Sequence, residues 1–418
     1  MFSGATLVQN VLLLISGVAV LLLITFPVAT QPIAVVEGRA LLASNTLAAG
    51  PTSGNFIGTT PINGVTPPFA GQPVQGFSAV IRTSNTGEYW AMPDNGYGSK
   101  ASSPDFNLRA YRITPDFKTA TGGTGNWNLG TYIELADPDR KISFTLTNNT
   151  GSRVLTGADF DIESMRVVAD GSIWFGDEFG PWLLHTDATG KVLEAPILMP
   201  GNLKSPNSQN LGTDTASVPN SRGFEGMALS ADGTKLYPML EGALVADTDK
   251  RRRVIYEFDL TSKSYTANRW DYRVDSPGYN TPELVSVSGS TFLVVERDSL
   301  VGAAALFKKV FAIDLKVRDC AGYLIKTEVL DMMNISDPTQ ISQQNIAGEV
   351  GVGTTFTFPY ETIEALLPLD SERVLIMNDN NYPNSANRNP GIPDYNEAVI
   401  VRTGGLKPTA TVKGPCTP

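Results

Sequence analysis

Four glutamates occupy equivalent positions in a repeated pattern of the 418-residue chain. They are Glu163 in DIESMRVV, Glu225 in GFEGMALS, Glu283 in TPELVSVS and Glu364 in TIEALLPL, and Ser78 holds the same place in GFSAVIR. A tight turn and a second apolar segment follow each of these segments. Asp-Gly between two such segments is a strong hairpin signal. The pattern therefore predicts five β-hairpins, of which four begin beside a carboxylate.

The second segment of each hairpin also ends in acidic residues. In a hairpin the start of the first strand lies beside the end of the second, so carboxylates should meet there. Crowded carboxylates raise one another's pKa or bind a cation. Oxygen ligands without His or Cys select Ca²⁺, or alternatively Mg²⁺. The predicted metal ligands are Asp94, Glu163, Asp177, Glu178, Glu225, Glu241, Glu283, Glu296, Glu364 and Asp379.

The composition excludes several competing chemistries. The chain has one histidine, His185, so sites built on several imidazoles are ruled out. His185 lies in WLLHTD, where we expect a packed strand residue beside Trp182. The net charge of −10 argues against binding to nucleic acid, which relies on Lys and Arg. Acids at loop ends and Asp-Gly turns also occur for purely structural reasons, which is the competing interpretation of the repeat.

The repeat also predicts the elements that position these acids. Its starts are 85, 62, 58 and 81 residues apart, and the chain is rich in Gly and Pro. Such spacing is compatible with four-stranded propeller blades that carry long loops. We predict an all-β fold, a single β-propeller of five to six blades over residues 35–418. The first strand of each blade would line a central channel, and residues 33–47 or 410–413 would complete the last blade. A pair of β-sandwiches and a right-handed β-helix are the alternatives.

The N-terminus carries an uncharged apolar segment from Val11 to Val28. Residues 1–34 are predicted to be a signal peptide or a retained membrane anchor, with a buried core helix as the alternative. Either export signal places the folded part outside the cytoplasm: in the periplasm, outside the cell, or anchored to the membrane through this segment alone. Cys320 and Cys416 would there be able to pair, or they are two free thiols.

Several segments resemble a known family in the family's order. They are PDNGYGSKASSPDFNLRAYRITPDF, DIESMRVVADGSIWFGDEFGPWLLHTDATGKVLEAPI, GFEGMALSADGTKLYPMLEGAL and NDNNYPNSANRNPGIPDYNEAVIVR. The chain resembles the phytase-like family known as "esterase-like activity of phytase", from about Gly76 to Arg402. The resemblance implies an exported β-propeller hydrolase related in architecture to calcium-dependent β-propeller phytases. By position it implies the site residues Asp94, Asn95, Glu163, Asp177, Glu178, Glu225, Glu241, Glu364, Asp379 and Asn380.

These observations predict an exported, metal-dependent hydrolase that acts on small phosphoesters. A metal-activated water would attack the phosphoester, with Glu163 and Glu225 as the first candidates for catalytic carboxylates. Arg297 would bind the phosphate, although a salt bridge to a neighbouring acid is its alternative role. Two other functions remain open: a calcium-stabilised propeller that only binds a partner, and a hydrolase of carboxyl esters or lactones.

Overall fold

The computed structural model of the protein describes residues 11–15, 18–22, 34–343, 346 and 348–408, in two compact units. The first unit, Met1–Ile33, contains β1 (Val11–Ile15) paired antiparallel with β2 (Val18–Leu22). No helix in the described ranges is long and apolar enough to cross a membrane. Most of the predicted signal peptide or anchor lies outside the described residues, so that assignment stays a prediction.

The second unit, Ala34–Pro418, contains three separate four-stranded antiparallel sheets that follow one another along the chain. The first sheet consists of β10 (Ile162–Val167), β11 (Ile173–Asp177), β12 (Trp182–Thr186) and β13 (Ile197–Leu198). The second consists of β14 (Phe224–Leu229), β15 (Lys235–Leu240), β16 (Arg252–Asp259) and β17 (Ser264–Arg273). The third consists of β18 (Leu284–Ser288), β19 (Thr291–Arg297), β20 (Lys308–Arg318) and β21 (Leu324–Asp331).

A ten-stranded sheet joins two further runs of four strands. One run is β6 (Phe77–Arg82), β7 (Tyr89–Pro93), β8 (Arg109–Asp116) and β9 (Asn126–Glu134). The other is β24 (Ile363–Pro368), β25 (Arg373–Asn378), β26 (Asn396–Arg402) and β3 (Val35–Leu42). The short elements are β4 (Leu47–Ala48), β5 (Gln72–Pro73), β22 (Ile335–Ser336), β23 (Thr355–Phe356) and the 3₁₀ turns η1 (Pro200–Asn202) and η2 (Gly302–Ala304). A parallel bridge between Leu41 and Asn126 connects the two runs.

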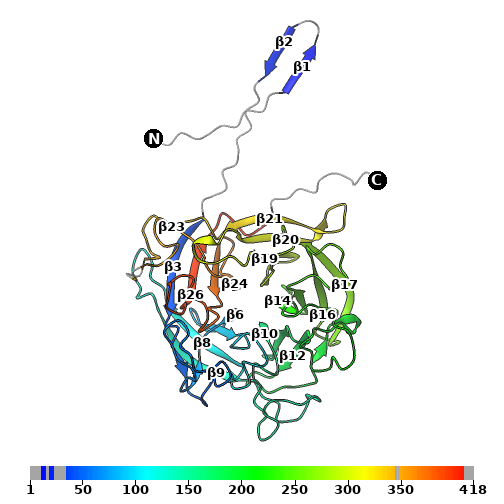
Figure 1. Cartoon of the computed structure of the whole chain (residues 1–418). Helices are drawn as coiled ribbons and strands as arrows, with labels where there is room; N and C mark the ends of the chain where they lie inside the picture. The colour runs from blue at the N-terminus through cyan, green and yellow to red at the C-terminus, as the bar shows by residue number, and fades with distance from the viewer. Residues whose placement is uncertain (1–10, 16–17, 23–33, 344–345, 347, 409–418) are drawn as a thin grey trace. The chain divides into compact units, whose positions relative to one another are not determined.

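The five runs surround a common centre, and the second unit is a β-propeller (Figure 1). The first strands β6, β10, β14, β18 and β24 contact one another in succession and form the inner ring. Strands in the middle of a run are buried on both faces, as in β11, because neighbouring sheets pack face to face. One apolar cluster, for example, joins Met92 and Ala110 of one run to Phe175 and Leu184 of the next. The prediction of a propeller is confirmed.

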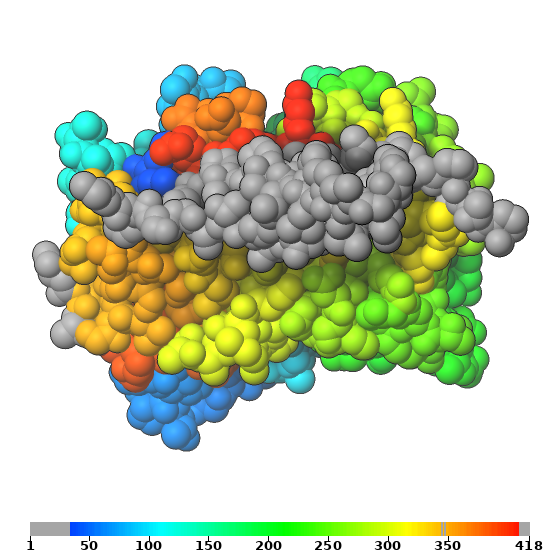
Figure 2. All heavy atoms as spheres, turned by 90° about the horizontal axis from the view of Figure 1, so that it is seen from above, coloured from blue at the N-terminus to red at the C-terminus, as the bar shows by residue number. Residues whose placement is uncertain are grey.

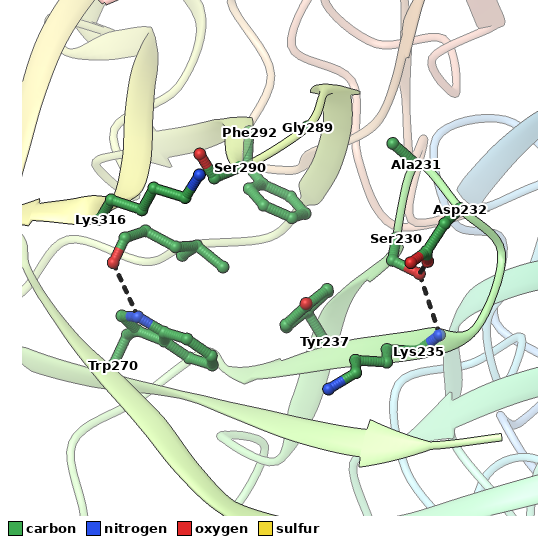
Figure 3. Close-up of a pocket in the computed structure, with 11 residues that line it drawn as sticks. Ser230, Ala231, Asp232, Lys235, Tyr237, Trp270, Gly289, Ser290, Phe292 and Lys316 are labelled. Carbon is green, nitrogen blue, oxygen red and sulfur yellow. Dashed lines mark hydrogen bonds between the residues drawn. The ribbon is translucent and has the colours of Figure 1, made fainter. Parts of the chain in front are cut away.

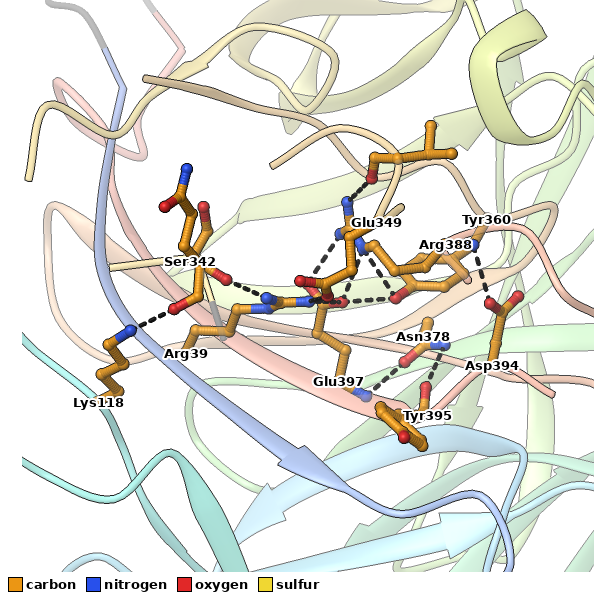
Figure 4. A network of polar contacts seen from close by, with 12 residues as sticks. Arg39, Lys118, Ser342, Glu349, Tyr360, Asn378, Arg388, Asp394, Tyr395 and Glu397 are labelled. Carbon is orange, nitrogen blue, oxygen red and sulfur yellow. Dashed lines mark hydrogen bonds and ion pairs between the residues drawn. The ribbon is translucent and has the colours of Figure 1, made fainter. Parts of the chain in front are cut away.

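The ring is closed by strands from the two ends of the unit. The strand β3 pairs antiparallel with β26, with Val399 opposite Arg39, and Figure 2 shows β3 in dark blue beside the red C-terminal strands. Residues 33–47 thus supply the strand that the sequence predicted, while the alternative segment 410–413 lies outside the described residues. Buried ion pairs reinforce this junction: Glu397 lies 3.2 Å from Arg39 and 2.9 Å from Arg388 (Figure 4).

The first strands β6, β10, β14 and β24 share a local irregularity at the repeated acid position, which β18 lacks. The pairing register shifts between Phe77 and Ala79, between Ile162 and Ser164, between Phe224 and Met227, and between Ile363 and Ala365. Each shift contains the residue that the repeat marks: Ser78, Glu163, Glu225 or Glu364. A β-bulge redirects a side chain and bends the strand. The bulges therefore determine which side chains reach the centre of the ring.

Candidate functional site

A cavity of about 140 Å³ lies where the first strands begin and the second strands end. Eight carboxylates and two guanidinium groups line it, together with small polar residues. The charged residues are Asp94, Asp161, Glu163, Glu178, Arg222, Glu225, Glu241, Arg297, Glu364 and Asp379. All eight acids come from the hairpin ends that the repeat predicted to converge. We call this cavity, with the charged residues that line it, the acidic cup.

Seven of the ten predicted metal ligands lie in the acidic cup, and so does Arg297. They are Asp94, Glu163, Glu178, Glu225, Glu241, Glu364 and Asp379. Asp177, Glu283 and Glu296 do not line the cavity. Seven of the predicted acids thus line one cavity, and the other three make contacts outside it.

Two of these exceptions follow from the alternation of side chains along a strand. Asp177 accepts hydrogen bonds from the backbone N–H groups of Asp161 (2.8 Å) and Gly180 (2.6 Å), whereas the next residue, Glu178, faces the cavity. Glu296 accepts a hydrogen bond from the Tyr272 hydroxyl at 2.7 Å, whereas the next residue faces the cavity. Adjacent strand residues point to opposite faces, so only one residue of each such pair can reach the cup.

The third exception, Glu283, precedes a strand that lacks the bulge at its start. It follows Pro282, and β18 begins only at Leu284. Its carboxylate lies 3.0 Å from the Arg166 guanidinium and accepts the backbone N–H of Leu284 at 2.8 Å. Glu283 therefore serves as the buried partner of Arg166, and the fourth hairpin contributes the cationic Arg297 to the cavity and no acid.

Asp161 belongs to the cup but was not among the predicted residues. It lies two positions before Glu163, and its carbonyl accepts the N–H of Glu178 at 2.9 Å. Gly76 and Gly223 make the corresponding backbone contact in two other hairpins, to Asp94 and Glu241. Since those positions hold glycine, the repeat alone gave no signal. Extending the hairpin pairing by two residues would have placed Asp161 opposite Glu178.

Three overlapping groups of carboxylates offer ligand atoms within 4.8 Å of one another. They are Asp94, Asp161 and Glu163; Glu163, Glu225 and Glu364; and Glu178, Glu225 and Glu241. Ca²⁺ binds oxygens at about 2.3–2.6 Å, so oxygens on opposite sides of one ion lie roughly 5 Å apart. The donors are all oxygens, which suits a hard cation such as Ca²⁺ or Mg²⁺. The residues present thus fit a divalent cation.

Burial and mutual repulsion raise the pKa values of several carboxylates in the cup. Burial raises the pKa of Glu163 well above its usual value, and the charge of Glu225 raises it further. The pKa of Glu225 is likewise raised by burial and then by Glu241 and Glu178. Burial raises the pKa of Asp161 to about 6. A bound cation would favour the ionised forms, so the arrangement couples cation binding to proton release.

Arg297 is the buried cation among these acids. One terminal nitrogen, Nη2, lies 3.4 Å from Glu241 Oε1 and 3.6 Å from Glu364 Oε1. Its Nε and Nη1 atoms are buried and have no hydrogen-bond partner among the described residues. The predicted salt bridge thus exists, yet it leaves the N–H groups of these two nitrogens free to donate. Arg222, at the half-exposed edge of the cavity, lies 2.6 Å from Glu241 Oε2.

The single histidine lies away from the cavity, as predicted. His185 on β12 stacks on Trp174 with ring centroids 4.0 Å apart. Its Nδ1 lies 2.8 Å from Glu194 Oε1 and its Nε2 lies 2.9 Å from Ser172 Oγ. Burial lowers its pKa. Both ring nitrogens have partners, so the imidazole is held in the sheet.

A second cavity, of about 420 Å³, has different chemistry (Figure 3). It lies by the hairpin turns that contain Asp232 and Gly289, at the strand ends opposite the acidic cup. Tyr237, Trp270 and Phe292 form its aromatic wall. It holds no cluster of acids, so its greater size does not make it the better candidate for hydrolysis.

Cys320 is disulfide-bonded. Cys416, its predicted partner, lies outside the described residues, so the pairing of the two stays a prediction.

The fold and the cup define a β-propeller with an acidic site at one end of its channel. Residues 72–382 match the phytase-like family described as "Esterase-like activity of phytase", and the chain belongs to this family. A relative from the fungus Arthroderma benhamiae, described as an "Uncharacterized secreted protein", is 24% identical over 337 residues, which are 60% of this chain and 64% of the relative. The chain thus spans less than two thirds of that relative's length.

Solved structures that resemble this chain are distant from it in sequence. The calcium-binding protein regucalcin of Agrobacterium tumefaciens is 11% identical, with a TM-score of 0.39 over 85% of this chain and 96% of that one. The PQQ-bound aldose sugar dehydrogenase of Streptomyces coelicolor is 10% identical, with a TM-score of 0.34 over 90% of this chain and 100% of that one. The Dos1 propeller is 10% identical, with a TM-score of 0.31 over 78% of this chain and 68% of that one.

Proposed function

We propose that the protein is an exported, calcium-dependent hydrolase of small phosphoesters that acts at the acidic cup. The observation that carries the proposal is the position of Arg297 beside the carboxylates, with two buried nitrogens whose N–H groups lack acceptors. Carboxylates attract a divalent cation, and an unpaired guanidinium edge attracts an anion. A phosphoester bound to a divalent cation would satisfy both at one place: the cation would bind the carboxylates, and the phosphate would accept hydrogen bonds from the guanidinium group.

Different residues of the cup would bind the cation, bind the phosphate and accept a proton. A bound divalent cation would lower the pKa of a water molecule and stabilise negative charge on the ester oxygens. Glu163 and Glu225 would be the main cation ligands of the cup, because each belongs to two of the three carboxylate groups. Arg297 would donate hydrogen bonds to the phosphate oxygens and orient the group. A neighbouring carboxylate whose pKa is raised toward neutrality would accept the proton of the attacking water.

The dimensions of the cavity support a small substrate. Its volume of about 140 Å³ suits one phosphate group with part of its alcohol. Arg297 is buried in the cavity, whereas Arg222 is 38% exposed and already paired with Glu241. Recognition of several phosphates requires several cationic side chains, and among the described residues only Arg222 and Arg297 bring such side chains to this cavity. We therefore propose a singly phosphorylated substrate and not a highly phosphorylated sugar.

Export rests on separate observations. The relative from Arthroderma benhamiae is described as secreted. Val11 to Val28 carry no charge, and Cys320 is disulfide-bonded, which is typical of oxidising compartments. Together they support a location outside the cytoplasm.

A substrate panel tests the proposal. The full chain is assayed with 4-nitrophenyl phosphate and 4-nitrophenyl acetate, with added Ca²⁺ and after chelation. We expect calcium-dependent release of 4-nitrophenol from the phosphate only. Turnover of the acetate alone would favour a carboxyl-ester hydrolase. No turnover of either ester, with a calcium-dependent rise in thermal stability, would favour a propeller that only binds a partner.

A further inference from the structure

The two outer carboxylate groups of the cup share no residue, so two ions can occupy them together. The Asp161 site consists of Asp94, Asp161 and Glu163, and the Glu178 site consists of Glu178, Glu225 and Glu241. The third group, Glu163, Glu225 and Glu364, takes one residue from each and lies between them. Its occupancy therefore competes with that of both outer sites.

Each outer site contains a buried oxygen that lacks a partner. Asp161 is 4% exposed and Glu178 is 5% exposed. Asp161 Oδ1 and Glu178 Oε1 have no hydrogen-bond partner among the described residues. A buried carboxylate oxygen without a partner loses its hydration and receives nothing in return. A cation at each site would supply the missing contact.

The middle group already has a positive charge beside it. Glu364 Oε1 lies 3.6 Å from Arg297 Nη2, and Glu364 Oε2 accepts a hydrogen bond from the Ser78 hydroxyl at 2.9 Å. Both oxygens of this carboxylate are thus engaged by the protein. The positive charge of Arg297 therefore takes over the role that a third cation would have at the middle group.

The two outer sites differ in their surroundings. Glu241, in the Glu178 site, forms ion pairs with Arg222 at 2.6 Å and with Arg297 at 3.4 Å. No ion pair in the described part of the chain involves Asp94, Asp161 or Glu163. A guanidinium group near a site repels an incoming cation and competes for its ligand. The Asp161 site should therefore bind a cation more tightly than the Glu178 site.

We propose that the acidic cup binds two divalent cations, a tighter one at the Asp161 site and a weaker one at the Glu178 site. The inference rests on the cation dependence of the proposed function but does not require hydrolysis. The weaker ion would lie nearer Arg297, whose free N–H groups would bind the same anion. Occupancy of the Glu178 site would then set the calcium concentration at which a phosphoester binds.

Isothermal titration of the metal-free full chain with CaCl₂ tests this inference. The wild type should show two binding events of unequal affinity. Asp161→Asn should weaken the tighter event at least tenfold and preserve the other, and Glu178→Gln should do the reverse. Both substitutions keep the shape of the side chain, and circular dichroism verifies the fold. Glu328→Gln, which removes an acid of the outer strand β21, serves as the matched control and should preserve both events.

Several results would overturn the inference. They are a single event in the wild type, loss of the same event in both variants, and loss of both events in a folded variant. Two binding events without turnover of 4-nitrophenyl phosphate would keep the two-ion site and contradict the proposed function. Calcium-dependent turnover with one bound ion would do the opposite, so the two failures are distinguishable.

Discussion

Without calcium, the folded protein should become less stable as the pH rises. Burial raises the pKa of both Asp161 and Asp379 from the ordinary 3.8 to about 6. The folded state therefore holds protons that the unfolded state has released, and stability falls between about pH 4 and pH 6 and stays low above it. One pKa unit corresponds to about 1.4 kcal/mol, so each residue contributes a loss of about 3 kcal/mol.

Calcium should reverse this dependence, because it binds the ionised carboxylates and competes with their protons. Differential scanning calorimetry between pH 4.5 and pH 8 with a chelator should show a falling Tm. About 2 kcal/mol of this loss falls between pH 4.5 and pH 8, and at roughly 1–2 °C per kcal/mol for a domain of this size one such residue lowers the Tm by about 2–4 °C. With calcium in excess the Tm should stay level or rise over the same range.

Asp161→Asn provides the internal control, because an amide does not titrate in this range. The metal-free variant should lose part of the pH slope and show a smaller stabilisation by calcium. A metal-free Tm that rises with pH would refute the reasoning. So would an equal calcium-induced shift at pH 4.5 and pH 8, because protons and the ion would then not share ligands.

Three further predictions concern single residues. Arg297→Lys keeps the charge but loses the planar fork, so the KM for 4-nitrophenyl phosphate should rise about 10- to 100-fold, the equivalent of one charge-assisted hydrogen bond; an unchanged KM would show that Arg297 does not bind the substrate. His185→Ala should keep turnover within about twofold, because the imidazole packs on Trp174 away from the cup. Equilibrium unfolding should show a loss of roughly 2 kcal/mol in the free energy of unfolding. Complete loss of turnover in the folded variant would contradict the carboxylate mechanism. Arg388→Ala should lower the free energy of unfolding by about 3–5 kcal/mol, because it removes a buried partner of Glu397; denaturation in urea measures this, and a change below 1 kcal/mol would show that the pair adds little to ring closure.

The repeat in the sequence was sufficient to predict the propeller and the end of the channel where the acids gather. Hairpin pairing depends on local turn chemistry and on alternating apolar residues, and both are visible along the chain. The last repeat needed one more strand, and the sequence offered residues 33–47 or 410–413 for it; the structure places β3, from the first of these segments, beside β26. The acids on the first strands were thus assigned correctly to one end of the hairpins.

The direction of individual side chains was not predictable in the same way. Asp177 and Glu178 are neighbours, and only the strand register decides which of them faces the cavity. Glu283 matches the repeat in sequence, yet without the bulge it binds Arg166 instead. Asp161 was missed because its counterparts in other hairpins are Gly76 and Gly223. Bulges and register depend on contacts between strands, which one sequence does not display.

The central claim is that a cation held by the acidic cup enables phosphoester hydrolysis. Its most direct test is the turnover of 4-nitrophenyl phosphate by the wild type and by Glu225→Gln, first with a chelator and then as Ca²⁺ is added back. The wild type should be inactive with the chelator and recover fully with calcium, whereas folded Glu225→Gln should stay at least 100-fold slower at the same calcium concentration. Equal turnover of the wild type with the chelator and with calcium, or full activity of Glu225→Gln, would contradict the account.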